Sequence, residues 1–131
     1  MFLTRTTVSG IRFAKAKVNG VNGVILLPDN WNASTYSLNN TNNGSASFSG
    51  NTISLSSWTV LENAGAVFLP AAGERYKTYV WDDGSNLYYW SATHYDSGRS
   101  YCVYFTDSEM YSNQIFAQYL GMSVRLVQNK P

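Results

Sequence analysis

The C-terminal third of this chain decides its fold, because residues 88–127 read YYWSATHYDSGRSYCVYFTDSEMYSNQIFAQYLGMSVRLV. A few positions have the aromatic or aliphatic character of a buried frame: residues 89–91, Tyr101, Val103, Phe105 and residues 121–127. The side chains between them follow no packing pattern. This division predicts a rigid frame that carries a displayed binding surface, and we expect residues 121–127 to close the fold as a strand with alternate side chains buried.

The predicted contact residues lie in two loops, near residues 93–99 and 106–120, and on the strand between them. Successive side chains of a strand face opposite ways. Residues 101–105 therefore predict Tyr101, Val103 and Phe105 on the core side and the other two side chains pointing outward. The full predicted ligand-binding set is Thr93, His94, Tyr95, Asp96, Ser97, Arg99, Cys102, Tyr104, Tyr111, Ser112, Asn113, Ile115, Phe116 and Leu120.

Tyrosine is concentrated in this half of the chain, where nine of the ten tyrosines lie at or beyond Tyr76. Its ring offers a large contact area and its hydroxyl a hydrogen bond at little rotamer cost, so binding loops favour it. We expect display for Tyr95, Tyr104 and Tyr111. The others are expected to pack in a β-rich core: Tyr76, Tyr79, Tyr89 and Tyr101.

Three apolar residues of the second loop, Ile115, Phe116 and Leu120, leave two readings open. If they are exposed, they mark an interaction site, because apolar patches are costly on a plain surface. Alternatively the loop folds back and buries one or two of them, Phe116 first.

Length and composition indicate one domain over residues 1–131, large enough to bury a core. Nine basic and eight acidic residues give a net charge of +1 without charged runs, so we expect no nucleic-acid partner. The single cysteine excludes an internal disulfide and a paired-cysteine metal site. No apolar run is long enough for a membrane span, and residues 1–5 do not have the pattern of a signal peptide.

Along the chain, short apolar runs separated by Asn, Ser and Gly predict short antiparallel strands and long loops, an α+β fold with one or two short helices. Strands are expected within residues 8–18, 24–27, 66–70, 78–81, 87–91, 100–105 and 122–127. Asn19-Gly20 and Asn22-Gly23 are turn signals. A helix is expected over residues 58–64, with Ser56-Ser57 at its N-cap and Gly65 at its end.

Residues 32–51 are rich in Asn, Ser, Thr and Gly, which predicts a long surface loop that adds nothing to the core. The tryptophans are expected in the core, although stacking of a sugar on one of them stays open. They are Trp31, Trp58, Trp81 and Trp90.

Four motifs in order resemble the Fib-succ-major (major paralogous) family: residues 22–31 (NGVILLPDNW), residues 62–73 (ENAGAVFLPAAG), Tyr89-Trp90-Ser91 and residues 121–127. The chain departs from the family pattern at Ala92, where a serine is usual, and at Gln118, where a basic residue is common. This resemblance implies a C-type-lectin-like fold and the C-terminal part of a longer protein on the surface of gut bacteria, such as a pilus-tip or lipoprotein adhesin.

The tract after residue 88 also resembles the variable region of proteins diversified by retroelements, which display mutable residues on a C-type-lectin-like scaffold. Mutation there strikes adenines, and the candidate contact residues are types reachable from AAT or AAC codons. The resemblance implies a hypervariable, adhesin-like module whose ligand is a protein or glycan on another cell or surface. Two alternatives stay open: a non-varying glycan-binding or structural module, and a receptor-binding protein of a phage tail tip.

An enzyme is not expected. A Cys/His nucleophilic pair would need His94 beside Cys102 and a third group to orient the histidine, and the alternation places Cys102 beside Tyr104 instead. Residues 82–86 (DDGSN) offer oxygen ligands for calcium but are also ordinary turn chemistry. We therefore expect no metal and no cofactor.

Overall fold

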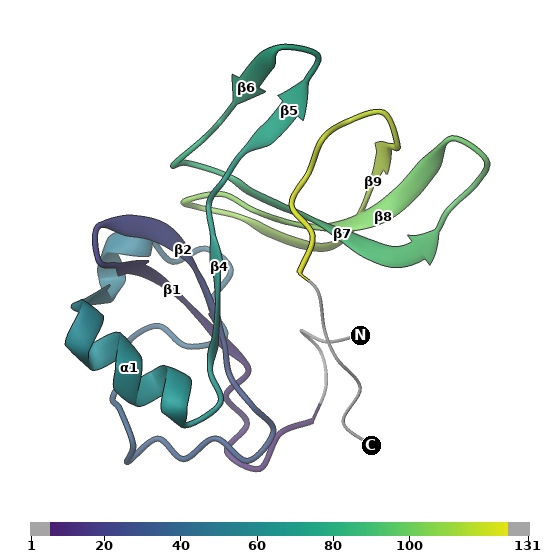
Figure 1. The fold of residues 1–131 in the computed structure, drawn as a ribbon. Helices are drawn as coiled ribbons and strands as arrows, with labels where there is room; N and C mark the ends of the chain where they lie inside the picture. Colours follow the sequence, from purple (N-terminus) through teal and green to yellow (C-terminus); the bar gives the residue numbers. More distant parts are fainter. Residues whose placement is uncertain (1–5, 126–131) are drawn as a thin grey trace.

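The computed structural model describes residues 6–125, which form two small β-sheets, one α-helix and a projecting hairpin (Figure 1). The elements, in chain order, are β1 (Phe13–Val18), β2 (Val21–Leu26), the 3-10 turn η2 (Phe48–Gly50), β3 (Thr52–Ile53), α1 (Leu55–Asn63), β4 (Val67–Pro70), β5 (Glu74–Tyr76), β6 (Tyr79–Trp81), β7 (Leu87–His94), β8 (Arg99–Phe105) and β9 (Met110–Ala117). The strand orders are β3-β1-β2-β4, β5-β6 and β7-β8-β9. Strands with one α-helix make an α+β architecture, as the sequence predicts.

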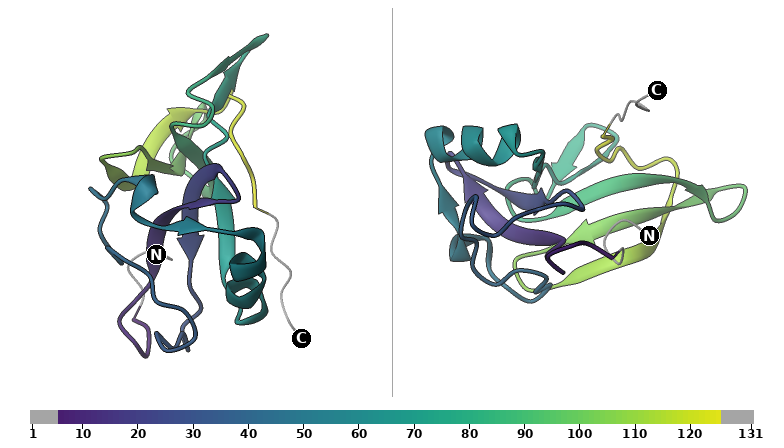
Figure 2. Two further views of the ribbon diagram at one scale, coloured as in Figure 1. Left: turned by 90° about the vertical axis from the view of Figure 1, so that its left-hand side faces the viewer. Right: turned by 90° about the horizontal axis from the view of Figure 1, so that it is seen from below.

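The first sheet is covered on both faces. One face packs with α1 and Trp31 in a cluster that includes Ile25 and Leu61. The other face packs against the second sheet, where the Phe13 and Phe105 rings meet edge to face with centroids 5.7 Å apart. The two sheets therefore share one core, and Figure 2 shows α1 on the side of the first sheet that faces away from the second.

The turn between β1 and β2 is the predicted Asn19-Gly20, both with positive φ (47° and 84°), as a tight hairpin turn requires. Asn22-Gly23 is not a turn, contrary to the prediction, and lies inside β2. Gly23 is needed there for space, because a Cβ at this position would lie 2.6 Å from the Phe68 ring of β4. A glycine that permits close packing has the same sequence signal as a glycine in a turn.

The predicted helix exists but begins earlier, at Leu55, because Ser54 is the N-cap and its Oγ accepts a hydrogen bond from the Ser57 amide at 3.2 Å. Gly65, with φ of 93°, follows the helix end as expected. Leu61 is fully buried, and Leu55 and Val60 are exposed.

Residues 32–51 do contribute to the core, which corrects the prediction. Phe48 in η2 is only 2% exposed and belongs to the shared core. The asparagines of this segment satisfy backbone groups: Asn51 donates to the Lys15 and Asn39 carbonyls, and Asn42 accepts from the Arg12 amide at 2.8 Å. The polar composition is therefore the hydrogen-bonding frame of an ordered loop.

Lys15 lies inside the shared core, with a side chain that is 1% exposed. Its Nζ donates to the carbonyl oxygens of Gly44 (2.6 Å), Thr106 (2.7 Å) and Glu109 (3.3 Å) and lies 5.6 Å from the centre of the Phe48 ring. Burial lowers the pKa of Lys15 to about 8, although the charges of Asp107 and Glu109 oppose this. The ammonium group of Lys15 thus joins β1 to the loop at Gly44 and to the turn between β8 and β9.

Two predictions for the C-terminal third are wrong. Residues 106–120, predicted as a loop, contain the eight-residue strand β9. Residues 122–125 are not a strand; Gly121 and Ser123 form isolated bridges to Arg75 and Tyr89, and Val124 is 62% exposed rather than buried. Residues 126 and 127 lie outside the described part of the chain. In the same part, no helix has the length and apolarity needed to cross a membrane.

Candidate functional site

The β7-β8-β9 sheet has two unlike faces. On its inner face, Leu87 and Phe105 pair across β7 and β8 and are fully buried in the shared core, whereas the other inner-face residues are half-buried: Tyr89, Tyr101, Val103 and Ile115. We call the opposite surface the outer face, defined by Tyr88, Cys102, Tyr104, Tyr111 and Phe116. The alternation predicted for residues 101–105 is confirmed, since Cys102 and Tyr104 share the face opposite to Val103 and Phe105.

A row of aromatic rings crosses the outer face. Tyr88 and Tyr104 are stacked with centroids 4.7 Å apart, and Tyr104 and Tyr111 are stacked at 5.8 Å. Phe116 meets Tyr88 edge to face at 5.8 Å. Exposure increases along the row, from 6% at Tyr88 through half-buried Tyr104 to 40% at Tyr111. The row thus offers ring surface to a ligand at one end and is held by the fold at the other.

The buried end of the row is held by the turn after β6. The Tyr88 hydroxyl donates to Asp82 Oδ2 at 3.1 Å, and Asn86 Nδ2 donates to the same oxygen at 2.9 Å. Burial raises the pKa of Tyr88, and burial also raises the pKa of Tyr104. Both phenols therefore stay protonated at neutral pH as hydrogen-bonding groups.

Cys102 is a correction to the predicted contact surface. It lies on the outer face but is 1% exposed, between its strand neighbours Trp90 and Gln114. Burial raises the pKa of its thiol to about 12, and the charge of Glu74, at the base of the β5–β6 hairpin, adds to the shift. Strand alternation gave the correct face but could not indicate that Cys102 is buried there.

The first predicted contact segment forms the β7–β8 turn and is exposed throughout: Thr93, His94, Tyr95, Asp96, Ser97 and Arg99. The turn is held internally. Arg99 donates to Asp96 Oδ2 through Nε at 2.9 Å, and its guanidinium lies 4.9 Å over the Tyr95 ring. Asp96 Oδ1 accepts from the Gly98 amide at 3.0 Å, and the bond to Arg99 lowers the pKa of the carboxyl.

Gln118 was missed by the sequence analysis as a positioning residue. Its Nε2 lies 3.0 Å from Ser100 Oγ and 2.9 Å from His94 Nδ1, and its amide donates to the Gly98 carbonyl. It therefore joins the end of β9 to the β7–β8 turn. Its position as a departure from the family pattern was the only sequence signal.

The second predicted contact segment is divided between the two faces. Tyr111 and Asn113 are exposed, and Ser112 and Asn113 together face Val103 as a β-bulge. Ile115 pairs with Tyr101 on the inner side, whereas Phe116 pairs with Ser100 on the outer side. Ile115, Phe116 and Leu120 are all half-buried, which agrees with neither full exposure nor full burial.

The predicted core aromatics of the hairpin are also a correction. Trp81 is 55% exposed, Tyr79 is 64% exposed and Tyr76 is 39% exposed. Trp31 is buried as predicted. The two strands that carry these rings, β5 and β6, are three residues long each and pair only with each other, so they have no sheet to bury them against.

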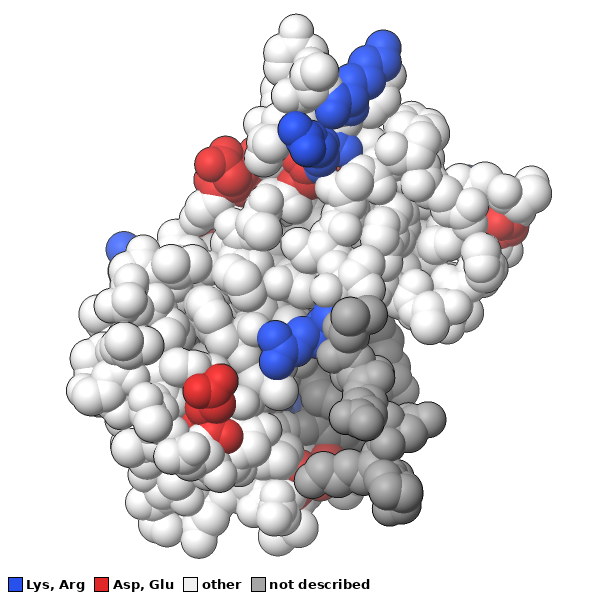
Figure 3. All heavy atoms as spheres, viewed as in Figure 1, with Lys and Arg blue, Asp and Glu red and all other residues white. Residues whose placement is uncertain are grey.

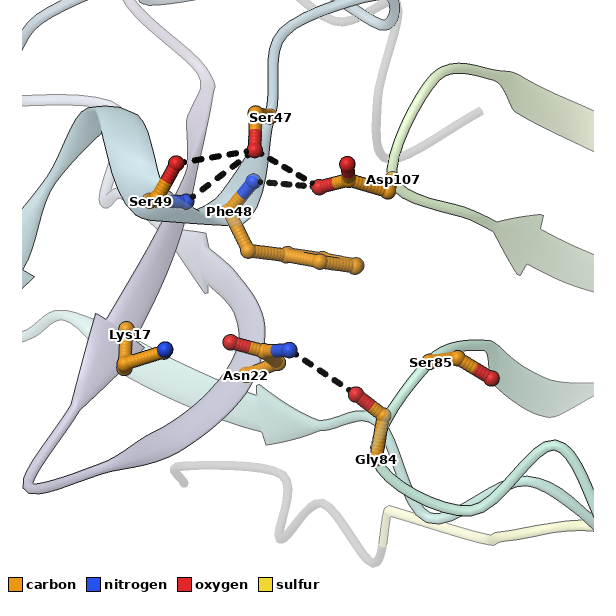
Figure 4. Close-up of a pocket in the computed structure, with 8 residues that line it drawn as sticks. All are labelled: Lys17, Asn22, Ser47, Phe48, Ser49, Gly84, Ser85 and Asp107. Carbon is orange, nitrogen blue, oxygen red and sulfur yellow. Dashed lines mark hydrogen bonds between the residues drawn. The ribbon is translucent and has the colours of Figure 1, made fainter.

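A polar cavity of about 350 Å³ lies where the β1–β2 hairpin, η2 and the turns after β6 and β8 meet (Figure 4). Asp107 Oδ1 accepts from Ser47 Oγ and from the Phe48 amide, and burial leaves Asn22 Oδ1 without a partner while its Nδ2 donates to the Gly84 carbonyl. The cavity is a junction between the two halves. The sequence analysis named Asn22 as part of a turn and Gly84 and Ser85 as part of a possible calcium turn, but it predicted no cavity there.

The residues weighed for a nucleophilic pair or for a metal site are not brought together in the described part of the chain. His94 is exposed and contacts Gln118, whereas the Cys102 thiol is buried in the sheet. Within residues 6–125, no group of three or more His, Cys, Asp or Glu side chains is placed to hold a metal ion.

Comparison with protein-family models, curated proteins and solved structures finds no match for this chain in any of the three.

Proposed function

We propose that the protein is a ligand-binding display domain of the C-type-lectin-like fold, a member of the Fib-succ-major family carried at the surface of a bacterial cell. The binding surface is the exposed end of the outer face together with the β7–β8 turn. Substitution of its exposed residues by a diversifying retroelement changes the partner without changing the core.

The observation that carries this proposal is the contrast between the two faces of one sheet. Leu87 and Phe105 on the inner face have no exposed surface, whereas Tyr111 on the outer face is 40% exposed and Tyr95 in the β7–β8 turn is 47% exposed. Exposed tyrosines on a rigid scaffold supply contact area at little entropic cost. Ligand affinity can therefore change at these positions while the free energy of unfolding is set elsewhere.

Burial divides the contact residues into two groups. Residues that are free to vary are the exposed ones, such as Thr93, Tyr95, Ser97, Tyr111 and Asn113. Cys102 is excluded from direct contact, because a larger side chain there would meet the base of the hairpin. Tyr104 and Phe116 are half-buried and support the surface as well as forming part of it.

A display library tests the capacity of this surface. Thr93, Tyr95, Ser97, Tyr111 and Asn113 are randomised together on yeast, and the library is selected against hen lysozyme. The matched control randomises five exposed residues in and around α1: Ser56, Thr59, Val60, Glu62 and Asn63. We expect folded binders from the first library only. Failure of the first library to yield binders, or equal success of the control, contradicts the proposal.

Sequencing copies of the gene from a natural population tests diversification directly. We expect adenine-directed changes at the exposed codons named above, and none at Leu87, Phe105 or Cys102. Changes spread evenly over residues 6–125 would refute diversification and would leave a non-varying module.

A further inference from the structure

Four aromatic side chains form a continuous exposed strip on the β5–β6 hairpin and the segment beside it. In order they are Trp81, Tyr79, Tyr76 and Tyr119, exposed by 55%, 64%, 39% and 74%. Trp81 and Tyr79 have ring centroids 6.3 Å apart, Tyr79 pairs with Tyr76 across the hairpin, and Tyr76 and Tyr119 are 5.8 Å apart. We call this set the aromatic strip.

The fold holds the strip away from the rest of the molecule. The hairpin projects beyond the second sheet, as Figure 1 and the left view of Figure 2 show. Gly73 lies at the start of the hairpin with φ of 65°. Glycine is needed there, because a Cβ at this position would collide with the Trp81 carbonyl oxygen. Arg75 and Gly121 exchange backbone hydrogen bonds of 2.6 and 2.7 Å, which fix Tyr119 beside Tyr76. The strip is thus a built surface, although no residue of the proposed binding set belongs to it.

The tip of the hairpin carries positive charge. Residues 75–80 contain Arg75 and Lys77 and no acid, whereas Glu74, Asp82 and Asp83 lie at the base of the hairpin. Arg75 pairs with Val80 and therefore lies on the face opposite to Tyr76 and Tyr79, so that Lys77 is the cation beside the rings. Figure 3 shows Lys and Arg side chains gathered on the projecting part. Within residues 6–125, neither cation forms a salt bridge. Lys77 Nζ lies 5.2 Å over the Tyr76 ring, and Tyr76, Lys77 and Tyr119 line an open depression of about 410 Å³. A complementary ligand is anionic.

Area and charge argue against a second protein surface as the occupant. Aromatic side chains bury about 150–250 Å² each, so at these exposures the strip offers roughly 500 Å². A stable protein–protein interface buries about 800 Å² on each partner. A two-fold contact between copies of this chain would also bring the Arg75 and Lys77 side chains of both copies together. A narrow, chain-like and acidic ligand meets neither objection.

We propose that the aromatic strip binds an acidic polysaccharide chain. The apolar C–H faces of successive pyranose rings stack on the rings of Trp81, Tyr79, Tyr76 and Tyr119. Carboxylates of uronic acid residues meet Lys77, whose Nζ lies over the Tyr76 ring. This site is separate from the variable surface and does not depend on the proposed display function.

Affinity electrophoresis and calorimetry with named polymers test the inference. The acidic probes are hyaluronan, alginate and polygalacturonate, and dextran and hydroxyethyl cellulose are the neutral controls. We expect binding to at least one acidic polymer that weakens as the salt concentration rises. The double variant Tyr79→Ala/Trp81→Ala should lose at least about tenfold in affinity, and Lys77→Gln should lose less.

The control is Tyr95→Ala/Tyr111→Ala, which removes two exposed tyrosines from the proposed display surface and should leave polysaccharide binding unchanged. Thermal unfolding shows that each variant is folded. Absence of binding to all three acidic polymers overturns the inference. So does equal binding by the Tyr79→Ala/Trp81→Ala variant, equal binding of the neutral polymers, or a dimer in sedimentation that the same variant dissociates. Loss of binding only in the Tyr95→Ala/Tyr111→Ala control would move the site to the display surface.

Discussion

The two sheets of this protein differ in how many of their faces are covered. The first sheet is enclosed between α1 and the second sheet. The first four residues of β1, Phe13 to Ala16, are therefore all buried, although their side chains face opposite ways. The second sheet is covered on its inner face by the shared core, and its outer face is covered in part, since Ser100 and Cys102 are buried there and exposure increases from Tyr88 to Tyr111. One core therefore stabilises both sheets, but only one sheet has a surface left for a partner.

This difference shows where sequence change can be tolerated. A substitution in the first sheet alters packing on one face or the other, because interiors are packed to the density of crystals. On the second sheet, burial along β8 does not simply follow the alternation of its side chains, because the outward Ser100 and Cys102 are buried and the outward Tyr104 is half-buried. Phe105 and Tyr104 are neighbours in sequence, yet their substitutions should have different consequences.

The largest expected effect is on the inner face. Phe105→Ala should lower the free energy of unfolding by about 3–5 kcal/mol, because it leaves a cavity beside Phe13. Tyr111→Ala, at the exposed end of the aromatic row, should cost about 1 kcal/mol or less. Urea unfolding followed by tryptophan fluorescence measures both. Equal losses of free energy of unfolding in the two variants would contradict the distinction between the two faces.

Lys15 gives the next effect. Lys15→Met keeps the apolar stem but removes the donor to Gly44, Thr106 and Glu109, and an unpaired buried acceptor costs about 1–3 kcal/mol. We expect a total loss of about 2–3 kcal/mol. Lys17→Met, on the same strand and half-buried, is the control and should change stability by about 0.5 kcal/mol or less. A small loss for Lys15→Met would show that water replaces the ammonium group.

The same lysine predicts a pH dependence. Its pKa is about 8 in the folded protein, below the value near 10.5 of the unfolded chain, so the unfolded state binds more protons between these values. The free energy of unfolding of the wild type, relative to Lys15→Met, should therefore rise by on the order of 1 kcal/mol between pH 8 and 10. Unfolding curves of both proteins at three pH values measure it. A difference that falls with pH would show that the buried ammonium is favoured.

Cys102 tests whether a residue can lie on the outer face and still be shielded from solvent. Because burial raises the thiol pKa from about 9 to about 12, the folded state holds this proton more tightly. The resulting stability is complete below pH 9 and is lost as the pH rises toward 12. The wild type should therefore lose more stability than Cys102→Ala between pH 9 and 10.5. A thiol reagent at pH 8 should label the folded protein no faster than it unfolds; rapid labelling would place the thiol at the surface.

The smallest effect is expected in the β7–β8 turn. Arg99→Ala removes an exposed ion pair, so the free energy of unfolding should change too little to resolve. The pKa of Asp96 should move up toward its ordinary value, because the guanidinium is the main cause of its depression. Carboxyl titration by NMR measures the shift. A large stability loss would show that this turn belongs to the folding core.

The parts of the structure that follow from local chemistry were predicted well. Asn19-Gly20 adopts positive φ wherever it occurs in a tight hairpin, and a serine before an apolar helical run caps it, although the cap is Ser54 rather than the predicted Ser56-Ser57. The opposite faces of Cys102 and Phe105 also follow from strand alternation alone.

The parts that depend on distant segments were not predicted. Phe48 is buried because Phe13 and Phe105 reach it from two sheets, and no property of its polar loop indicates this. β9 was assigned to a loop because the bulge at Ser112 and Asn113 breaks the alternation that identifies a strand. Trp81 was assigned to the core because a tryptophan is usually buried, but the short β5–β6 hairpin projects away from any partner.

The sequence by itself determined the strand-rich architecture with one helix, its tight turn, and the inward and outward sides of β8, because these depend on backbone preferences and on a period of two residues. Only the tertiary structure decided which outward side chains reach solvent. Exposure depends on what the rest of the fold places over a residue, and Cys102, on the outward side of β8, is 1% exposed. Tyr111 has no such cover and remains available to a ligand.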